Sequence, residues 1–188
     1  MGPLITHLPN TISALRMVLA PVFLYATAID IRLGLMIFII SALSDWLDGY
    51  IAKSLDLSSP LGALLDPLGD KAISWAALCV ICQQYPLASI WIASSLIIIR
   101  DVIITTKRIR QYKANKFDTQ FAVSTLAKIK TVLLFSAQIT LMLNIVNENG
   151  LVYITGSMLL YASSLLTLIS FGHYLKRPEV AERKITRE

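Results

Sequence analysis

Long apolar segments separated by short polar connections run through the whole chain. A bilayer-spanning helix needs roughly 20 mostly apolar residues, and six segments reach that length if a few embedded charges are tolerated. We therefore predict an all-α protein, a single membrane domain over residues 1–188 with six spanning helices and a cavity that faces the cytoplasm. The predicted spans are residues 9–29, 33–53, 66–83, 87–106, 121–146 and 151–174.

The composition favours a membrane protein over a soluble one. Of the 188 residues, 55% are hydrophobic and only 15% are charged, and the mean hydropathy is +0.65. Soluble domains are typically about 25% charged, and disordered chains are poor in apolar residues. The net charge of +5 suits a negatively charged partner, such as an anionic membrane surface or a phosphate-containing substrate. Basic residues interleaved with aromatic ones are missing from the sequence, so we expect no nucleic-acid partner.

The connections between the predicted spans alternate in charge. Residues 30–32, 83–86 and 147–150 are nearly uncharged, whereas residues 107–121 and the C-terminal tail are rich in lysine and arginine. Lysine and arginine concentrate on the cytoplasmic side of membrane proteins. We therefore expect both termini and the candidate site to face the cytoplasm. The expected location is a bacterial inner membrane, with an organellar membrane as the alternative.

Charged residues interrupt five of the six predicted spans at a similar depth. At about 1.5 Å of rise per residue, Arg16, Asp45, Asp70, Arg100 and Lys130 each lie about 20–25 Å from the extracytoplasmic end of their helix. That level is the cytoplasmic third of a hydrocarbon core about 30 Å thick. Lysine and arginine can extend to the headgroups, but aspartate is too short. We therefore expect these charges to face inward, to pair or to bind ions.

Four aspartates carry the strongest chemical signal. Asp45 and Asp48 are three residues apart, and Asp66 and Asp70 are four apart, so each pair shares one face of a helix. Pro67 is compatible with a helix that begins there. Four clustered carboxylates cannot all stay ionised without cations; buried lysines could supply them, but hard divalent ions suit clustered oxygens better. Two such ions about 3.5–4 Å apart would suit in-line displacement at phosphorus.

The segment between the two aspartate pairs, predicted as a loop over residues 49–65, carries small residues that allow close approach of a backbone or a ligand. From residue 45 the chain reads Asp-x-x-Asp-Gly-x-x-Ala-Lys, then eight residues, then Gly-x-x-x-Asp-x-x-x-Asp. This pattern resembles the signature of the CDP-alcohol phosphatidyltransferase family. It departs from the signature at Lys53, where the family usually has arginine, so the charge remains but the bidentate fork is lost.

The resemblance implies that an alcohol attacks the phosphorus of a CDP-linked lipid and that CMP leaves. By similarity, Asp45, Asp48, Asp66 and Asp70 hold two divalent metal ions, magnesium first and manganese as the alternative. Asp70 matches the general base for the attacking hydroxyl, and the family also implies a homodimer. The residues expected at the CDP group are Asn10, Ser13, Asp48, Gly49, Ala52, Lys53 and Gly62.

Basic residues near the cytoplasmic edge narrow the choice of acceptor alcohol. The segment 127–131, Ala-Lys-Ile-Lys-Thr, resembles a Gly-Lys-x-Lys-Thr segment of family members that use glycerol 3-phosphate. Glycerol 3-phosphate is a small dianion, which needs fixed cations to lie near four carboxylates and a pyrophosphate. The two lysines of this segment diverge by about 200° around a helix, so only one of them is expected to point into the site. The residues expected at the acceptor phosphate are Arg100, Arg108, Lys128 and Lys130.

The predicted reaction is transfer of the phosphatidyl group from CDP-diacylglycerol to sn-glycerol 3-phosphate, which gives phosphatidylglycerophosphate and CMP. Phosphatidylglycerol is the alternative acceptor and would give cardiolipin; inositol phosphate or serine is less favoured. A small membrane transporter is the alternative outside the enzymes, and it would place its polar site near the midplane of the bilayer, often on broken helices related by an internal repeat. A membrane scaffold would not need four aspartates at fixed spacing. Release of CMP would distinguish an enzyme from a transporter and from a scaffold, because neither of these would release it.

Overall fold

The computed structural model describes residues 18–55, 62–113 and 125–175, and every regular element in these ranges is an α-helix. The predicted all-α fold class is therefore confirmed. The prediction of six membrane spans stays a prediction. The described helices are Val18–Ile29, α2 (Ile31–Leu55), α3 (Gly62–Gln84), α4 (Ala88–Lys113), α5 (Thr125–Asn147) and α6 (Gly150–Leu175).

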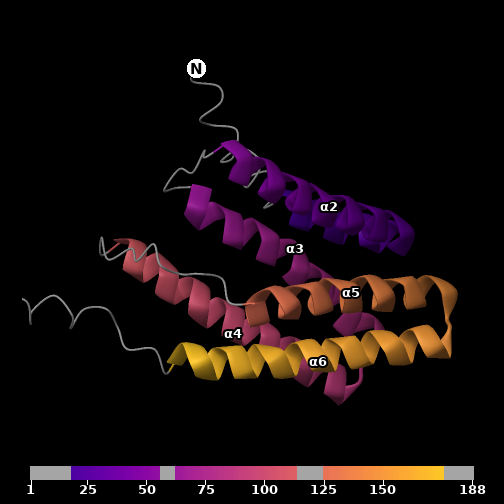
Figure 1. The fold of residues 1–188 in the computed structure, drawn as a ribbon. Coiled ribbons are helices and arrows are strands. Elements are labelled where there is room, and N and C mark those ends of the chain that lie inside the picture. Colours follow the sequence, from indigo (N-terminus) through magenta and orange to yellow (C-terminus); the bar gives the residue numbers. More distant parts are fainter. Residues whose placement is uncertain (1–17, 56–61, 114–124, 176–188) are drawn as a thin grey trace, which may run out of the picture.

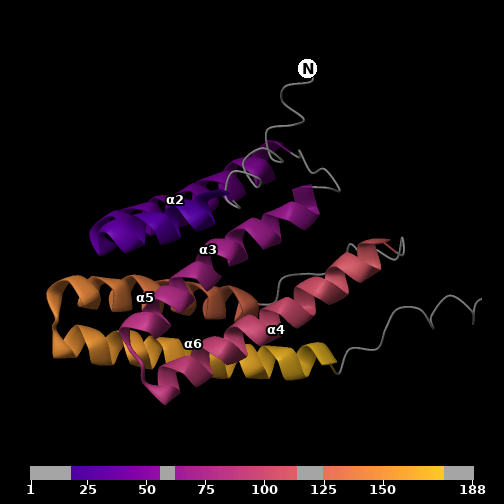
Figure 2. The same cartoon turned by 180° about the vertical axis from the view of Figure 1, so that it is seen from behind.

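The third helix, α3, lies in the middle of the bundle. The helix Val18–Ile29 runs alongside α2 on one side of α3, and α4, α5 and α6 lie on the other side (Figures 1 and 2). Helices α5 and α6 form an antiparallel hairpin with the most extensive packing in the described bundle, and α6 also packs against α4. Helix α3 contacts α2, α4 and α5, so residues of these three helices surround it.

The prediction of a loop over residues 49–65 is wrong for most of its length. Helix α2 continues to Leu55 and α3 begins at Gly62, so most of the predicted loop 49–65 is helical. Pro67 consequently lies beyond the first turn of α3. The φ of proline fits a helix, and its cost here is the hydrogen bond that the Ala63 carbonyl would otherwise accept. Helix α4 continues to Lys113, beyond the predicted span 87–106, because lysine and arginine are good helix formers.

Two very short connections are closed by polar caps. The Asp30 carboxylate accepts a hydrogen bond from the Arg32 backbone N–H at 2.8 Å, at the start of α2. The Asn149 side-chain carbonyl accepts one from the Leu151 N–H at 2.9 Å, at the start of α6. Both are N-caps, which satisfy backbone donors that the first helical turn leaves open. They allow the chain to reverse within a few residues at what we predict to be the extracytoplasmic face.

Aromatic packing joins the N-terminal helices to α5. The rings of Phe23 and Phe38 have centroids 6.0 Å apart, and Phe38 stacks on Phe135 at 5.5 Å. Phe23 and Phe38 are fully buried. Offset and tilted aromatic pairs of this kind add about 0.5–1.5 kcal/mol to the burial of their area. The contacts fix α2 against α5 and so help to define where its second half, which carries Asp45 and Asp48, lies.

A buried polar contact joins α3 to α5. The Gln138 side-chain N–H donates to the Ser74 carbonyl oxygen at 2.7 Å, and its side-chain carbonyl accepts from the Ser74 hydroxyl at 3.2 Å. Gln138 is fully buried. Interhelical hydrogen bonds in membranes average about 0.6 kcal/mol and reach about 2 kcal/mol. This pair therefore fixes the register of α3, one turn after Asp70, against α5.

The outer surface of the bundle is apolar. Large hydrophobic side chains such as Met36, Ile40, Ile92, Met158 and Leu165 are more than half exposed. Within the described ranges, three helical segments are long and apolar enough to cross a membrane. Contiguous exposed apolar surface of this kind needs lipid or protein to cover it. The qualifying segments are Ala88–Lys107, Lys128–Asn147 and Gly150–Gly172.

We expect the Gly156→Ala substitution to destabilise the α5–α6 hairpin. A Cβ at position 156 would meet the Leu141 side chain at 2.8 Å and its backbone nitrogen at 3.2 Å, and Leu141 is itself fully buried. Overpacking of this kind costs about 1–3 kcal/mol. The measurement is the free energy of unfolding in detergent by SDS titration.

Gly172→Ala is the matched control, since Gly172 lies in the same helix and a Cβ there meets nothing within 4 Å. Both variants gain the same helix propensity of about 1 kcal/mol. The difference between them therefore isolates the steric effect. Equal stabilities for the two variants would contradict the close approach of α5 and α6.

Candidate active site

The four signature aspartates lie in two neighbouring helices. Asp45 and Asp48 are in the second half of α2, and Asp66 and Asp70 are in the first turns of α3. Their backbone is helical, so spacings of three and four place each pair on one helix face. Helices α2 and α3 are adjacent in both views (Figures 1 and 2). The side chains of all four lie outside the part that the structure describes.

The residues predicted at the CDP group fall around the same two helices. Gly49, Ala52 and Lys53 follow Asp48 in α2, and Gly62 is the first residue of α3. They are therefore helical, which agrees with the predicted span 33–53 for the first three, and small residues on facing helices allow close approach. Asn10 and Ser13 lie outside the described residues. Their assignment to the CDP group stays a prediction.

Next to this region, cationic side chains from three helices lie around one buried aspartate. The carboxylate is Asp101 of α4, which is 7% exposed. Its Oδ1 lies 2.7 Å from Nη1 of Arg100 and 3.4 Å from Nζ of Lys130 in α5. Nζ of Lys71 in α3 donates to the Asp101 backbone carbonyl at 3.4 Å and to the Thr105 hydroxyl at 2.7 Å. We call Lys71, Arg100, Asp101 and Lys130 the Asp101 cluster.

The predicted acceptor-phosphate residues separate into two groups. Arg100 and Lys130 belong to the Asp101 cluster and are largely buried, with side chains 11% and 12% exposed. Lys128 is exposed, as its offset of about 200° from Lys130 around α5 requires. Arg108 lies in α4, and its side chain is outside the described part. The described residues therefore bring Arg100 and Lys130 together and leave Lys128 on the surface.

Sequence reasoning missed two members of the cluster, Lys71 and Asp101. Lys71 directly follows Asp70, and Asp101 directly follows Arg100. A carboxylate inside an apolar segment is costly without a partner, and this was the signal that could have found Asp101. The contact between Asp101 and Lys130 of α5 could not be found in this way, because the two residues are 29 positions apart in the chain.

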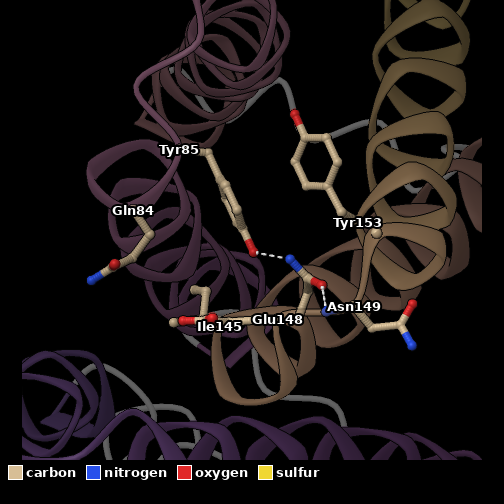
Figure 3. A pocket seen from close by; sticks show the side chains of 8 residues that line it. Gln84, Tyr85, Ile145, Glu148, Asn149 and Tyr153 are labelled. Carbon is tan, nitrogen blue, oxygen red and sulfur yellow. Dashed lines mark hydrogen bonds between the residues drawn. The ribbon is translucent and has the colours of Figure 1, made fainter.

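A cavity of about 420 Å³ lies at the other end of the bundle. Tyr85 and Tyr153 both line it, as Figure 3 shows, and their ring centroids are 5.2 Å apart. The Tyr85 hydroxyl accepts a hydrogen bond from the Asn144 amide at 2.7 Å and donates to the Leu141 carbonyl at 3.3 Å. Burial raises the pKa of this hydroxyl, against the Asn144 hydrogen bond, which lowers it. Since Gln84 on the rim is about 21 Å along α3 from Asp70, this cavity is separate from the candidate active site.

Comparison with known proteins assigns the family. Residues 6–169 match the family model for CDP-alcohol phosphatidyltransferases. The chain belongs to the CDP-alcohol phosphatidyltransferase family. It is 30% identical over 172 residues to a protein of Wigglesworthia glossinidia brevipalpis, covering 89% of this chain and 92% of the relative. It is also 31% identical over 176 residues to a protein of Haemophilus influenzae, covering 90% and 92%. Both relatives are named CDP-diacylglycerol–glycerol-3-phosphate 3-phosphatidyltransferase.

The resemblance of the signature to this phosphatidyltransferase family is therefore confirmed, and with it the prediction of a transferase. Together with the three long apolar helices, membership in a membrane-enzyme family makes the chain an integral membrane protein. The roles of individual residues remain predictions. So do the orientation in the membrane and the dimer.

The chemistry of the donor set fits divalent metal ions, which members of this phosphatidyltransferase family generally use. Four carboxylates on adjacent helices provide hard oxygen ligands, and magnesium prefers such ligands. Among the described side chains no group of three or more potential ligands occurs. The assignment of a metal site to Asp45, Asp48, Asp66 and Asp70, whose side chains are outside that set, stays a prediction.

Proposed function

We propose that the protein transfers the phosphatidyl group from CDP-diacylglycerol to sn-glycerol 3-phosphate, giving phosphatidylglycerophosphate and CMP. The observation that carries this proposal is the match, over about nine-tenths of the chain, to relatives named for that reaction. The Asp101 cluster supports it, because it places the positive charge of Arg100 and of Lys130 beside the signature helices. This charge complements a phosphate monoester dianion.

The proposed chemistry is a displacement at phosphorus. The acceptor hydroxyl oxygen forms a bond to the phosphorus of the phosphatidyl group, the bond from that phosphorus to the CMP oxygen breaks, and CMP leaves. Asp70 accepts the hydroxyl proton. A carboxylate is a weak base for an alcohol, but a fixed position close to the hydroxyl makes it effective. Divalent ions held by the four aspartates would neutralise charge that develops on the leaving CMP.

Arg100 and Lys130 are the proposed ligands of the acceptor phosphate. Arginine binds phosphate through paired N–H donors, and lysine binds it as a point charge. Arg100 has its Nε–H buried, with no hydrogen-bond acceptor for it among the described residues. An unsatisfied buried donor costs about 1–3 kcal/mol, so a ligand oxygen there would be stabilising. Arg108 and Lys128 remain proposed contributors nearer the surface.

Release of CMP from CDP-diacylglycerol tests the acceptor. Purified protein with magnesium is offered glycerol 3-phosphate and phosphatidylglycerol in separate reactions. We expect turnover with glycerol 3-phosphate. Turnover with phosphatidylglycerol alone would favour the cardiolipin reaction, whose acceptor is a monoanionic diester that needs fewer cations. Silence with both would leave the family assignment in place and remove the proposed acceptor.

We expect chelation of divalent metal by EDTA to reduce CMP release to background, because four adjacent carboxylates cannot bind a pyrophosphate without cations. Addition of excess magnesium restores turnover, and manganese serves as the comparison. The measurement is the initial rate of CMP release before and after each addition. Full activity in EDTA would contradict the proposed two-metal site.

The proposed setting is the cytoplasmic side of a bacterial inner membrane, with the protein as a homodimer. The basic residues after Thr106 support this orientation, since lysine and arginine favour the cytoplasmic side. Accessibility of single cysteines, introduced near either end of α4, to a membrane-impermeant thiol reagent tests it in spheroplasts.

A further inference from the structure

The arrangement of the Asp101 cluster points to a role for its carboxylate. Asp101 is the acidic member of the cluster, and it lies between side chains of α4 and α5. A buried carboxylate at this depth is costly unless it is paired. Its Oδ1 accepts from Arg100 Nη1 at 2.7 Å and from Lys130 Nζ at 3.4 Å. One oxygen atom therefore fixes the positions of both proposed phosphate ligands.

The Arg100 guanidinium is fixed at two of its three nitrogens. Nη1 donates to Asp101, and Nη2 donates to the Ser170 hydroxyl of α6 at 3.2 Å. The third nitrogen, Nε, is buried, and the described residues provide no acceptor for it. A planar guanidinium held in this way has one defined orientation. The Nε–H of Arg100 is therefore a hydrogen-bond donor with a fixed position and direction.

Lys130 is held from its backbone as well as from its side chain. Its carbonyl accepts a hydrogen bond from the Ser163 hydroxyl of α6 at 3.2 Å. The Asp101 backbone carbonyl, in turn, accepts from Lys71 of α3. These two contacts use backbone carbonyls and join α3 to α4 and α5 to α6. They do not depend on the Asp101 carboxylate, so we expect loss of its charge to free the Arg100 and Lys130 side chains while the helices stay packed.

We propose that Asp101 is a positioning residue, which orients Arg100 and Lys130 so that they bind the phosphate of the acceptor. This inference rests on the proposed function. Asp101 does not touch the substrate; its Oδ1 holds the Arg100 guanidinium and the Lys130 ammonium at fixed positions. Preorganised donors bind an anion better than mobile ones, because their ordering is complete before the ligand arrives.

The test is steady-state kinetics of Asp101→Asn, with Asp101→Glu as the variant that keeps the charge. For Asp101→Asn we expect the KM for glycerol 3-phosphate to rise about 10-fold or more, the loss typical of a charge-assisted hydrogen bond. The KM for CDP-diacylglycerol should change by less than about 2-fold. Asp101→Glu should recover most of the loss, because the carboxylate remains.

The control variant is Asp30→Asn, which removes another carboxylate at an exposed turn, where asparagine can still cap α2. We expect both KM values of this variant to match those of the wild type. A purely structural role for Asp101 would lower kcat with every substrate and leave both KM values unchanged. That result would overturn the proposal, as would a fall in the KM for glycerol 3-phosphate.

A binding measurement separates failure of this inference from failure of the proposed function. The thermal midpoint of each detergent-solubilised variant is measured with inorganic phosphate and with glycerol 3-phosphate, without CDP-diacylglycerol. We expect both ligands to raise the midpoint of the wild type and neither to raise that of Asp101→Asn. A wild type that gains stability but shows no turnover would end the proposed function and retain the Asp101 role. Equal gains in wild type and Asp101→Asn would overturn that role, as would a wild type with neither gain nor turnover.

Discussion

Asp70→Asn abolishes CMP release while the helical bundle remains folded. Asparagine has nearly the same shape as aspartate, so the packing at the start of α3 is kept, but the amide cannot accept the hydroxyl proton. General base catalysis contributes about 10²–10⁴-fold. Loss of a carboxylate from the proposed metal site adds to this. We expect a fall of at least about 10³-fold in kcat, measured as CMP released per mole of purified protein.

Far-UV circular dichroism and the thermal midpoint check that Asp70→Asn is folded. Asp30→Asn provides the same chemical change at an exposed turn, outside the proposed site. It should retain wild-type turnover. Full activity of Asp70→Asn would remove Asp70 from the role of base. Loss of the thermal transition would instead show that the carboxylate is needed for folding.

Lys130→Asn raises the KM for glycerol 3-phosphate far more than the KM for CDP-diacylglycerol. Lys130 approaches Asp101 at 3.4 Å, with a side chain 12% exposed, so its charge is poorly screened. Loss of a charged hydrogen bond costs about 1.5–3 kcal/mol, which corresponds to roughly 10- to 150-fold in the KM for the acceptor. The measurement is initial rates over a range of each substrate at saturating levels of the other.

Lys128→Asn is the matched comparison, because it removes the same charge two residues away on α5, where the side chain is exposed. A solvated cation contributes less than a buried one, so the effect on the KM for glycerol 3-phosphate should be smaller. An equal rise in both KM values for Lys130→Asn would exclude Lys130 from the acceptor subsite. A larger effect for Lys128→Asn would place the acceptor phosphate nearer the surface.

The helical fold and the family followed from local patterns. Apolar segments of spanning length predict helices wherever they occur, and the aspartate spacing depends only on residues that are close together in the chain. The hydrophobic pattern predicts where an apolar span ends but not where its helix ends. The apolar stretch of α4 ends near Thr106, but hydrogen bonding continues to Lys113, because a helix needs no apolar side chains once it leaves the lipid.

The Asp101 cluster shows what a single sequence does not provide. Its members Lys71, Asp101 and Lys130 come from three helices and are about 30 residues apart along the chain. Their contact depends on how α3, α4 and α5 cross, and no spacing rule encodes that crossing. The sequence could identify Arg100 and Lys130 as cations at the right depth. Their common carboxylate becomes visible only in three dimensions.

The hydrogen bonds of Gln138 restrict how a lipid with two acyl chains can reach the site. Passage between α3 and α5 would require breaking all contacts of Gln138 with Ser74. In hydrocarbon no water replaces such bonds, and each unsatisfied group costs several kcal/mol. Tyr85, which directly follows α3, accepts a further hydrogen bond from Asn144 of α5. The seam between α3 and α5 is therefore closed to diacylglycerol chains from Ser74 onward, so a lipid that reaches Asp70 enters on the other side of Ser74 or through another face of the bundle.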